Sequence, residues 1–315
     1  MQREDSFRRG VSLSVYGGSS EEPSTKPTYG KFLDDIVDLG ATDLELVVRW
    51  FQVDTKAIEI APSALSTVED ELLTWLMDEA NTRGLRVCLT PVLEIEAEGP
   101  KETRSAIEPE AWDRWWWSYE RFVTHYARLA GTHKAALLSV GSDLTSTQSQ
   151  TDRWRELVRD VRKVYRGKLW YSAAIDHVSE VGFWDAVDVV GVTGYQTALI
   201  PAAGSDEELR KAMTPQATKL RSWALAEGKR YLFTDLGLFT PGADRSKLLM
   251  DELRRQRTTY EVWQDDPRLE GMMAGAWLGR APQVALPGVR ERPAAEVLRH
   301  WYRASRVAAQ GSILP

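Results

Sequence analysis

Two aspartates follow apolar runs in the same way, and carboxylates in that position can do chemistry. Asp143 lies in "LLSVGSDLTS" (137–146), and Asp235 lies in "YLFTDLGLFT" (231–240). Cleavage of a glycosidic bond needs two carboxyl groups that face each other across the bond. Each aspartate also has a simpler interpretation, because Asp143 could cap a turn and Asp235 could be an ordinary hydrogen-bond acceptor. Their joint occurrence after two similar runs favours a site.

The elements that must position these aspartates form one repeated pattern. Short runs of near-continuous hydrophobicity, typical of parallel strands that are buried on both faces, alternate with longer helical patterns. The predicted strands cover residues 10–16, 43–50, 85–93, 135–141, 168–175, 188–195, 230–237 and 271–279. Eight such units predict a single α/β domain over residues 1–315, a (β/α)₈ TIM barrel whose barrel extends from about residue 9 to 303.

Helical spacing supports the same architecture. The predicted helices cover 28–39, 67–84, 112–130, 152–165, 206–227, 244–263 and 293–304, with a short, weak pattern near 179–186. Gly40 occupies the place of a C′ glycine, and Thr67 stands at N-cap spacing before Asp70. An aromatic stripe at helical spacing is predicted to pack in the core: Trp115, Tyr119, Phe122 and Tyr126, continued by Leu129. An open doubly wound sheet is disfavoured, because "SVYGGSSEEP" is not a G-x-G-x-x-G phosphate loop.

In such a barrel the reacting groups lie at the carboxyl ends of the strands. The side chains predicted at these ends are Arg49, Trp50, Asp143, Asp176, His177, Tyr195, Asp235, Trp277 and Arg280. Carboxylates, aromatic rings and hydrogen-bonding groups of this kind are typical of a sugar-binding site, with Trp50, Tyr195 and Trp277 as candidate platforms.

The sequence lacks the motifs that several other kinds of catalytic site require. The four histidines form neither an H-x-H nor an H-E-x-x-H pair, which argues against a histidine-based metal hydrolase. The stretch "VGSDL" is not a G-x-S-x-G elbow, so Ser142 has little support as a nucleophile. Cys88 is the one cysteine and is predicted to be a buried thiol. No metal site and no cofactor are indicated.

Composition narrows the partners and leaves the compartment open. The net charge of −6 and the absence of a large basic block argue against nucleic acid. The sequence contains no run of 18 apolar residues, so no membrane-spanning helix is predicted. The start "MQREDSFRRG" has no apolar segment of a signal peptide, so the chain as given carries none, although a mature or truncated form would also lack one. Hydrophobic residues make up 43% of the chain, which is enough for a sizeable core.

Beyond these patterns, most of the chain, from about residue 9 to 303, resembles a known family. The matching stretches are "AIEPEAWDRWWWSYERFVTHYARLA" (106–130), "LLSVGSDLTS", "WRELVRDVRKVYRGKLWYSAAID" (154–176), "FWDAVDVVGVTGYQTAL" (183–199), "KRYLFTDLGL" (229–238) and "RPAAEVLRHWY" (292–302). Within the (β/α)₈ glycoside hydrolases that carry catalytic glutamates on strands 4 and 7, the sequence is most similar to glycoside hydrolase family 113. The known members of that family degrade β-mannan, so the resemblance implies a carbohydrate partner.

The resemblance also implies roles for single residues. Asp143 corresponds to the general acid/base and Asp235 to the nucleophile, while Tyr195 would orient the nucleophile and Trp277 would lie under the reacting sugar. Both catalytic positions would be glutamate in the family and are aspartate here. Ser142 stands where many relatives in the wider superfamily carry asparagine. A location outside the cytoplasm is compatible with the family if the sequence is a mature form.

The shorter acids leave three hypotheses open. Each loss of a methylene withdraws a carboxylate by roughly 1.5 Å. Two such losses would widen a retaining gap to roughly 7–8.5 Å, within the inverting range. The chain could therefore be an inverting glycoside hydrolase on a β-linked polysaccharide or oligosaccharide. It could also be a pseudoenzyme that binds sugar, or a structural or partner-binding barrel, because a displacement of about 1 Å can cost on the order of a hundredfold in rate.

Overall fold

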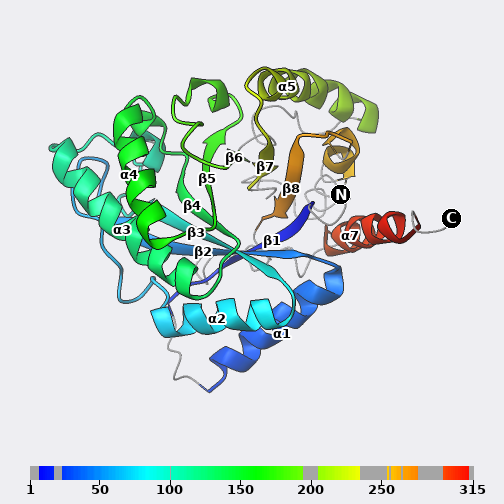
Figure 1. Cartoon of the computed structure of the whole chain (residues 1–315), viewed down its shortest axis with the longest axis horizontal. Helices are drawn as coiled ribbons and strands as arrows, with labels where there is room; N and C mark the ends of the chain where they lie inside the picture. The colour runs from blue at the N-terminus through cyan, green and yellow to red at the C-terminus, as the bar shows by residue number, and fades with distance from the viewer. Residues whose placement is uncertain are drawn as a thin grey trace.

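A computed structural model describes residues 7–17, 23–99, 101–193, 205–234, 254, 257–263, 265–275 and 294–311. Its centre is a closed barrel of parallel strands that pair in chain order, from β1–β2 round to β8–β1 (Figure 1). The strands are β1 (Arg8–Ser14), β2 (Asp43–Gln52), β3 (Arg86–Ile95), β4 (Leu137–Ser142), β5 (Lys168–Ala174), β6 (Val189–Thr193), β7 (Tyr231–Phe233) and β8 (Leu269–Ala274). The predicted (β/α)₈ barrel is confirmed.

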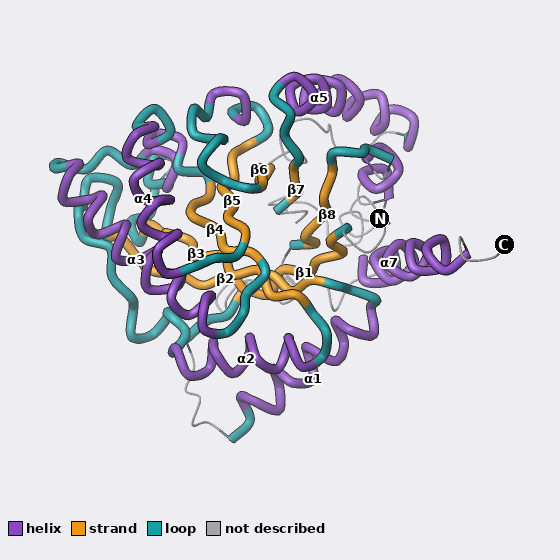
Figure 2. The backbone as a smooth tube through the Cα atoms, in the orientation of Figure 1, coloured by secondary structure: helices purple, strands orange, loops and turns teal. Residues whose placement is uncertain are grey.

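Helices surround the sheet on its outer side, as Figure 2 shows. They are α1 (Thr25–Leu39), α2 (Asp70–Thr82), α3 (Trp112–Thr132), α4 (Thr151–Val164), α5 (Asp206–Ala226) and α7 (Ala294–Gly311). Short 3-10 turns follow three strands: η1 (Arg104–Ala106) after β3, η2 (Thr145–Thr147) after β4 and η3 (Val178–Glu180) after β5. The weak pattern near 179–186 therefore corresponds to one 3-10 turn and further turns. Most of the predicted helix 244–263 lies outside the described residues.

The core has two apolar layers. The larger layer lies between the strands and the helices, and it contains the aromatic stripe of α3, whose four rings are buried as predicted. The smaller layer fills the barrel interior with one side chain from each of six strands: Cys88, Leu137, Trp170, Val189, Leu232 and Met273. The thiol of Cys88 is buried here, as expected.

A charged cluster completes the barrel interior at the amino-terminal ends of β1, β2 and β3. The buried carboxylate of Asp43 accepts hydrogen bonds from the guanidinium groups of Arg8 and Arg86. Each of the three is the first residue of its strand, so the cluster lies at the end of the barrel opposite the mouth. Two guanidinium partners neutralise a buried carboxylate that would otherwise cost several kcal/mol.

Strand β2 alternates strictly between the two layers. Its first two inward side chains are acidic: Asp43 accepts hydrogen bonds from the two arginines, and the buried Glu45 accepts them from hydroxyls on β1 and β3. Its outward side chains belong to the outer layer: Leu44, Leu46, Val48 and Trp50. This alternation decides which residues of β2 can reach the mouth.

Two predictions about helix ends had different outcomes. Gly40 follows α1 at φ +95° and donates its N–H to the carbonyl of Val37, as a C-terminal glycine does. The predicted N-cap at Thr67 is wrong, because α2 begins at Asp70 and no side-chain cap is formed. The hydroxyl of Thr67 instead donates to the carbonyl of Arg49 across 2.8 Å and anchors the loop to β2.

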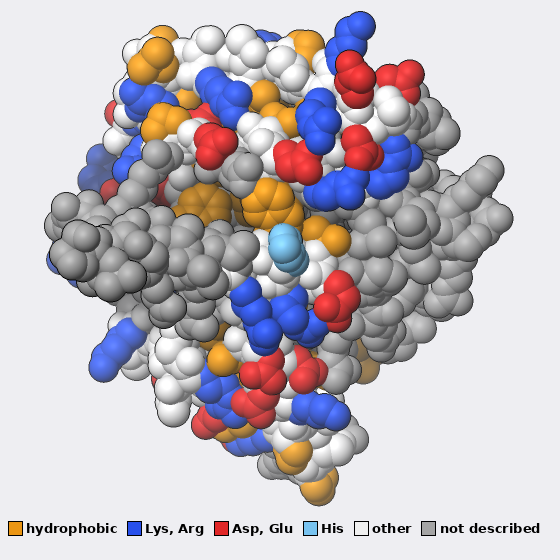
Figure 3. All heavy atoms as spheres, turned by 90° about the vertical axis from the view of Figure 1, so that its right-hand side faces the viewer, with side chains coloured by type: hydrophobic (Ala, Val, Ile, Leu, Met, Phe, Trp, Pro, Cys, Tyr) orange, Lys and Arg blue, Asp and Glu red, His pale blue; other side chains and the backbone are white. Residues whose placement is uncertain are grey.

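No helix in the described ranges is long and apolar enough to cross a membrane. On the face drawn in Figure 3, basic and acidic side chains lie interspersed among the residues that are drawn in colour. Ion pairs also join neighbouring elements, as in the contact of Arg155 on α4 with Asp185 across 3.0 Å.

Candidate functional site

Asp143 lies at the carboxyl end of β4, where the backbone departs from regular strand geometry. The pairing of β4 with β5 shifts between Ser139 and Ser142. Asp143 then takes φ +55°, in the left-handed region that aspartate tolerates better than most residues. The next turn begins at Thr145 and its N-cap position is Leu144, so Asp143 is not that turn's cap. The register shift and the left-handed backbone therefore determine the direction of the Asp143 carboxylate at the end of the strand.

Three donors hold the carboxylate of Asp143. The hydroxyl of Thr193, at the end of β6, donates to Oδ1. The hydroxyl of Ser142 and the guanidinium of Arg104 both donate to Oδ2, each across 3.2 Å. An ionised carboxylate only accepts hydrogen bonds, and this set of donors suits that form. The Asp143 side chain is still 23% exposed, so a ligand at the mouth can reach it.

Hydrogen bonds continue from Asp143 across the neighbouring strands. The Asp143 N–H donates to the carbonyl of Ser172 on β5 across 3.0 Å. The hydroxyl of Thr234, just past β7, lies 3.1 Å from the Ser172 hydroxyl. Thr234 directly precedes Asp235 in the sequence. The polar rim therefore extends from Asp143 to the residue before the second candidate carboxylate.

Several predicted site residues lie outside the described part of the chain. They are Tyr195, Asp235 and Trp277, together with Arg280. The pairing of Asp143 with Asp235 and the two aromatic platforms remain predictions.

Arg49 lies on the inward face of β2, near its carboxyl end. Its guanidinium donates to the Ser14 hydroxyl across 3.2 Å and pairs with Glu94 across 3.4 Å. The same guanidinium stacks on the ring of Tyr16, 4.7 Å from its centroid. The remaining nitrogen, Nη1, is buried and has no hydrogen-bond partner among the described residues. Arg49 thus contributes a fixed cation to the β1–β3 side of the mouth.

The strand 5 candidates lie in the loop after β5. Asp176 is exposed, and His177 is partly exposed. The His177 ring nitrogen Nδ1 lies 2.7 Å from a carboxylate oxygen of Glu180, one turn further along the chain. The contacts of His177 tie it to its own loop and not to Asp143.

Trp50 does not face the barrel mouth, which corrects its prediction as a platform there. Its ring packs on the outer side of β2 against α3, with centroids 5.4 Å from Phe122 and 5.5 Å from His125. The side chain is 8% exposed. Because Arg49 points inward, its neighbour along the strand must point outward.

The buried tyrosines behind β4 and β5 are not candidates for proton transfer. Burial raises the pKa of the Tyr119 phenol well above its ordinary value, and it also raises that of Tyr171. The Tyr119 hydroxyl donates to the carbonyl of Val140 across 2.9 Å.

Within the described ranges, no group of three or more His, Cys, Asp or Glu side chains could hold a metal ion.

Sequence reasoning missed Arg104 and Thr193, the two residues from other elements that hold Asp143. Thr193 could have been found from alternation, because Val189, Gly191 and Thr193 share one face of β6. Arg104 had a weaker signal, as a basic residue in the long loop after strand 3. Loops in this position form the mouth of a barrel.

The fold and this rim can be compared with known proteins. A β-1,4-mannanase of family 113 superposes with a TM-score of 0.77 at 22% identity, covering 95% of this chain and 99% of that chain. A family 113 β-mannanase from Alicyclobacillus acidocaldarius gives a TM-score of 0.79 at 22% identity, covering 96% and 100%. A β-glucuronidase from an uncultured Clostridium species gives 0.64 at 13% identity, covering 95% of this chain and 50% of that one. Identities this low show a shared fold.

The comparison of the sequence with protein-family models is more specific than the comparison of folds. None of the curated proteins matches this chain. The model of Glycoside Hydrolase Family 113, however, matches residues 20–264, which is most of the barrel. The chain belongs to glycoside hydrolase family 113.

Proposed function

We propose that this protein hydrolyses a β-linked, mannan-type polysaccharide or oligosaccharide, with Asp143 as the general acid and Asp235 as a base that activates water. The observation that carries the proposal is the placement of Asp143 at the carboxyl end of β4 in a family 113 barrel, held by Thr193, Ser142 and Arg104. The mannanases with the same fold support the choice of substrate.

The proposed stereochemistry follows from the length of the two acids. Retaining glycosidases hold their carboxyl groups about 5–5.5 Å apart, and inverting ones about 6.5–9.5 Å apart. Aspartate at both positions withdraws each carboxylate by roughly 1.5 Å relative to glutamate on the same backbone. The wider gap leaves room for a water molecule, so we propose inversion at the anomeric carbon.

A second candidate function is sugar binding without turnover. It is favoured by the contacts of Asp143, because all three described partners donate to the carboxylate whereas a general acid must carry a proton to the leaving group. Under the hydrolytic proposal, Arg104 must release Oδ2 when that proton is taken up. Under the binding proposal, the ion pair persists.

Turnover of mannan and manno-oligosaccharides separates the two functions. Asp143→Asn and Asp235→Asn should each abolish hydrolysis and leave binding in calorimetric titration largely intact, because the amides keep size but lose the acid and the base. Proton NMR in the first minutes of hydrolysis should show a product whose anomeric configuration is inverted. A product with retained anomeric configuration would refute the mechanism in which Asp235 activates water.

The double variant Asp143→Glu with Asp235→Glu tests the pseudoenzyme alternative. It should restore the short gap, so retaining activity that appears only in this variant would identify the parent as a pseudoenzyme. Absence of turnover in parent and double variant, on gluco-, xylo- and mannan substrates, would exclude the hydrolase. Absence of binding as well would leave a structural or partner-binding barrel.

A further inference from the structure

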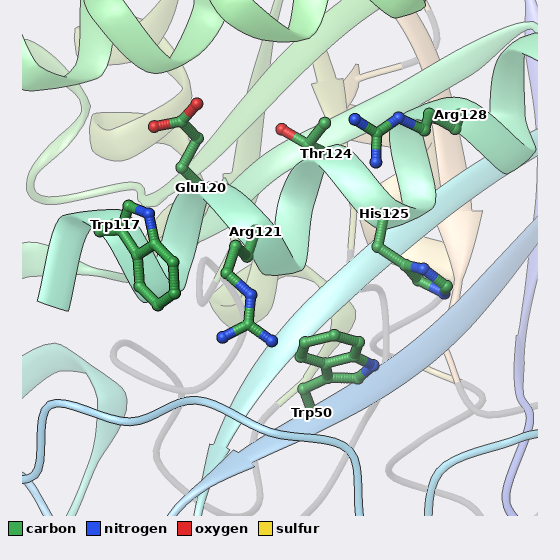
Figure 4. Close-up of a pocket in the computed structure, with 7 residues that line it drawn as sticks. All are labelled: Trp50, Trp117, Glu120, Arg121, Thr124, His125 and Arg128. Carbon is green, nitrogen blue, oxygen red and sulfur yellow. The ribbon is translucent and has the colours of Figure 1, made fainter. Parts of the chain in front are cut away.

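A hollow of about 340 Å³ lies outside the barrel, where α3 covers β2. It is lined by Trp50 of β2 and by one face of α3 from Trp117 to Arg128 (Figure 4). Trp50 is directed away from the barrel interior, so the hollow is separate from the rim that holds Asp143. Its volume is at the lower end of the range found for small-ligand sites, about 300–1,000 Å³.

The hollow carries a tryptophan that does not serve the core. The Trp117 side chain is 62% exposed, whereas its neighbours Trp115 and Trp116 are buried. The guanidinium of Arg121, one turn along α3, lies 4.9 Å from the Trp117 ring centroid. This cation–π contact holds the ring in place and leaves ring surface facing solvent. An ordered, exposed indole is a suitable platform for the apolar face of a sugar ring.

The polar groups of the hollow are available to a ligand. None of Glu120, Arg121 and Arg128 forms an ion pair within the described residues. By contrast, Arg153 and Arg155 of the neighbouring helix α4 pair with Asp113 and Asp185. Figure 4 shows Glu120 and Arg128 along the upper edge of α3, with Thr124 between them, and Arg121 along the lower edge, pointing toward Trp50.

Thr124 provides an independent sign that a partner is missing. Its hydroxyl oxygen is buried and has no hydrogen-bond partner among the described residues. A buried hydroxyl without a partner costs free energy, and rotation of the Thr124 side chain toward a ligand with hydroxyl groups would satisfy it. At the other end of the hollow, His125 is held by Asp70 across 3.0 Å, which fixes the wall next to Trp50.

The mixture of charges selects the class of ligand. Two guanidinium groups donate hydrogen bonds and the Glu120 carboxylate accepts them, a combination that suits a neutral polyhydroxyl compound. An anionic ligand would be attracted by the two guanidinium groups but repelled by Glu120, whereas a neutral ligand with hydroxyl groups can use all three. We propose that this hollow is a secondary binding site for a neutral β-linked sugar chain, with Trp117 as its platform. The proposal rests on the proposed function for its choice of sugar.

The position of Trp117 is useful for such a role. Helix α3 begins on the mouth side of the barrel, in the connection that follows β3, and Trp117 lies five residues after its first residue, Trp112. At 1.5 Å per residue, this places Trp117 roughly 8 Å below the start of the helix. A polysaccharide held there can extend toward the mouth, so the site would keep the enzyme on an insoluble chain.

Binding to insoluble mannan tests the proposal. Trp117→Ala should weaken retention of the full-length protein about tenfold, the effect expected for one stacked ring. Hydrolysis of a short soluble manno-oligosaccharide should be unchanged. Leu225→Ala, which removes another exposed apolar side chain, 66% exposed on α5, is the control and should retain the parent's binding.

A resonance of Trp117 itself supplies the second readout. In protein with ¹⁵N-labelled tryptophan, the Trp117 indole signal, assigned with Trp117→Phe, should shift when mannohexaose is added and not when oligogalacturonate is added. An unmoved signal and unchanged retention in Trp117→Ala would overturn the proposal, as would a response to the acidic sugar alone. A shift at Trp117 without any hydrolysis would refute the proposed function and leave this site standing.

Discussion

The guanidinium of Arg104 lies 3.2 Å from the carboxylate of Asp143, so the loop after β3 is joined to the end of β4 by an ion pair at the barrel mouth. The two side chains are 33% and 23% exposed, which means that the pair is partly screened by solvent. Its contribution to stability is therefore small. Its importance lies in fixing the orientation of the carboxylate.

Replacing Arg104 should affect the reaction more than the fold. We expect Arg104→Ala to lower kcat for manno-oligosaccharides by about tenfold to a hundredfold, because Asp143 loses one of the donors that aim it. KM should change little. Arg104→Lys should recover part of the rate, since it restores the charge but not the planar donor geometry.

Steady-state kinetics and thermal unfolding would check this prediction. Arg166→Ala is a matched control, because Arg166 is exposed and lies just before β5, at the opposite end of the barrel. A change confined to KM would instead make Arg104 a contact for bound sugar.

Gly141 should not tolerate a side chain. A Cβ atom at this position would lie 2.8 Å from the Trp154 ring, 2.9 Å from the Tyr119 hydroxyl and 3.0 Å from the Tyr171 ring. All three rings are buried, so Gly141→Ala should lower the free energy of unfolding by about 1–3 kcal/mol. Turnover should fall as well, because Asp143 lies two residues further along the same strand end.

Urea unfolding followed by tryptophan fluorescence would measure the effect. The control is Gly30→Ala in α1, where the nearest atom to a new Cβ is 3.9 Å away. It should stabilise the protein by about 0.5–1 kcal/mol, since alanine favours helix over glycine. Equal stabilities of the two variants would contradict the packing argument.

Asp266 should contribute to the loss of stability in acid. Burial alone would raise the pKa of its carboxyl, but hydrogen bonds from Tyr231, from the Arg268 backbone and from Arg221 outweigh burial and lower it. A carboxyl whose pKa is lowered by folding stabilises the protein above its unfolded value, about 3.9. That stabilisation is lost as pH falls through the lower, folded value.

The prediction is a difference in pH dependence. Between about pH 5 and pH 3, the free energy of unfolding should fall more steeply in the parent than in Asp266→Asn. The variant should be less stable than the parent at pH 7, because its amide cannot replace the ion pair between the buried Asp266 carboxylate and the partly exposed Arg221. Asp152→Asn, at a side chain that is 97% exposed, should follow the parent curve. Parallel curves for the parent and Asp266→Asn would rule out this carboxyl as a source of acid sensitivity.

The barrel was predictable because its signals are local and repeated. Strands buried on both faces read as apolar runs, and the helices between them keep their own spacing. The end of β4 and the position of Asp143 after it were also predicted correctly. The structure adds what no local pattern encodes: a register shift in β4, a left-handed Asp143, and an arginine brought to it from 39 residues away.

Trp50 shows that a position near the end of a strand does not by itself place a side chain at the mouth. Its place near a strand end predicted a role at the mouth, yet the alternation of β2 assigns Arg49 to the interior and Trp50 to the helix layer. Thr67 illustrates a different limit. Its type and spacing fit an N-cap, and only the distant carbonyl of Arg49 shows that the hydroxyl is used elsewhere.

The alternation of β2 has a consequence for how the chain can change length. A strand that slips by one residue exchanges its two faces. In β2, such a slip would move Asp43 and Glu45 into the apolar layer between the strands and the helices. It would also turn Leu44 and Leu46 toward the ion pairs inside the barrel. Both faces would be penalised at once, so the strand has a single workable alignment with its neighbours. The loop between β2 and α2 can be lengthened without a change of register. A one-residue insertion inside β2, by contrast, should prevent folding.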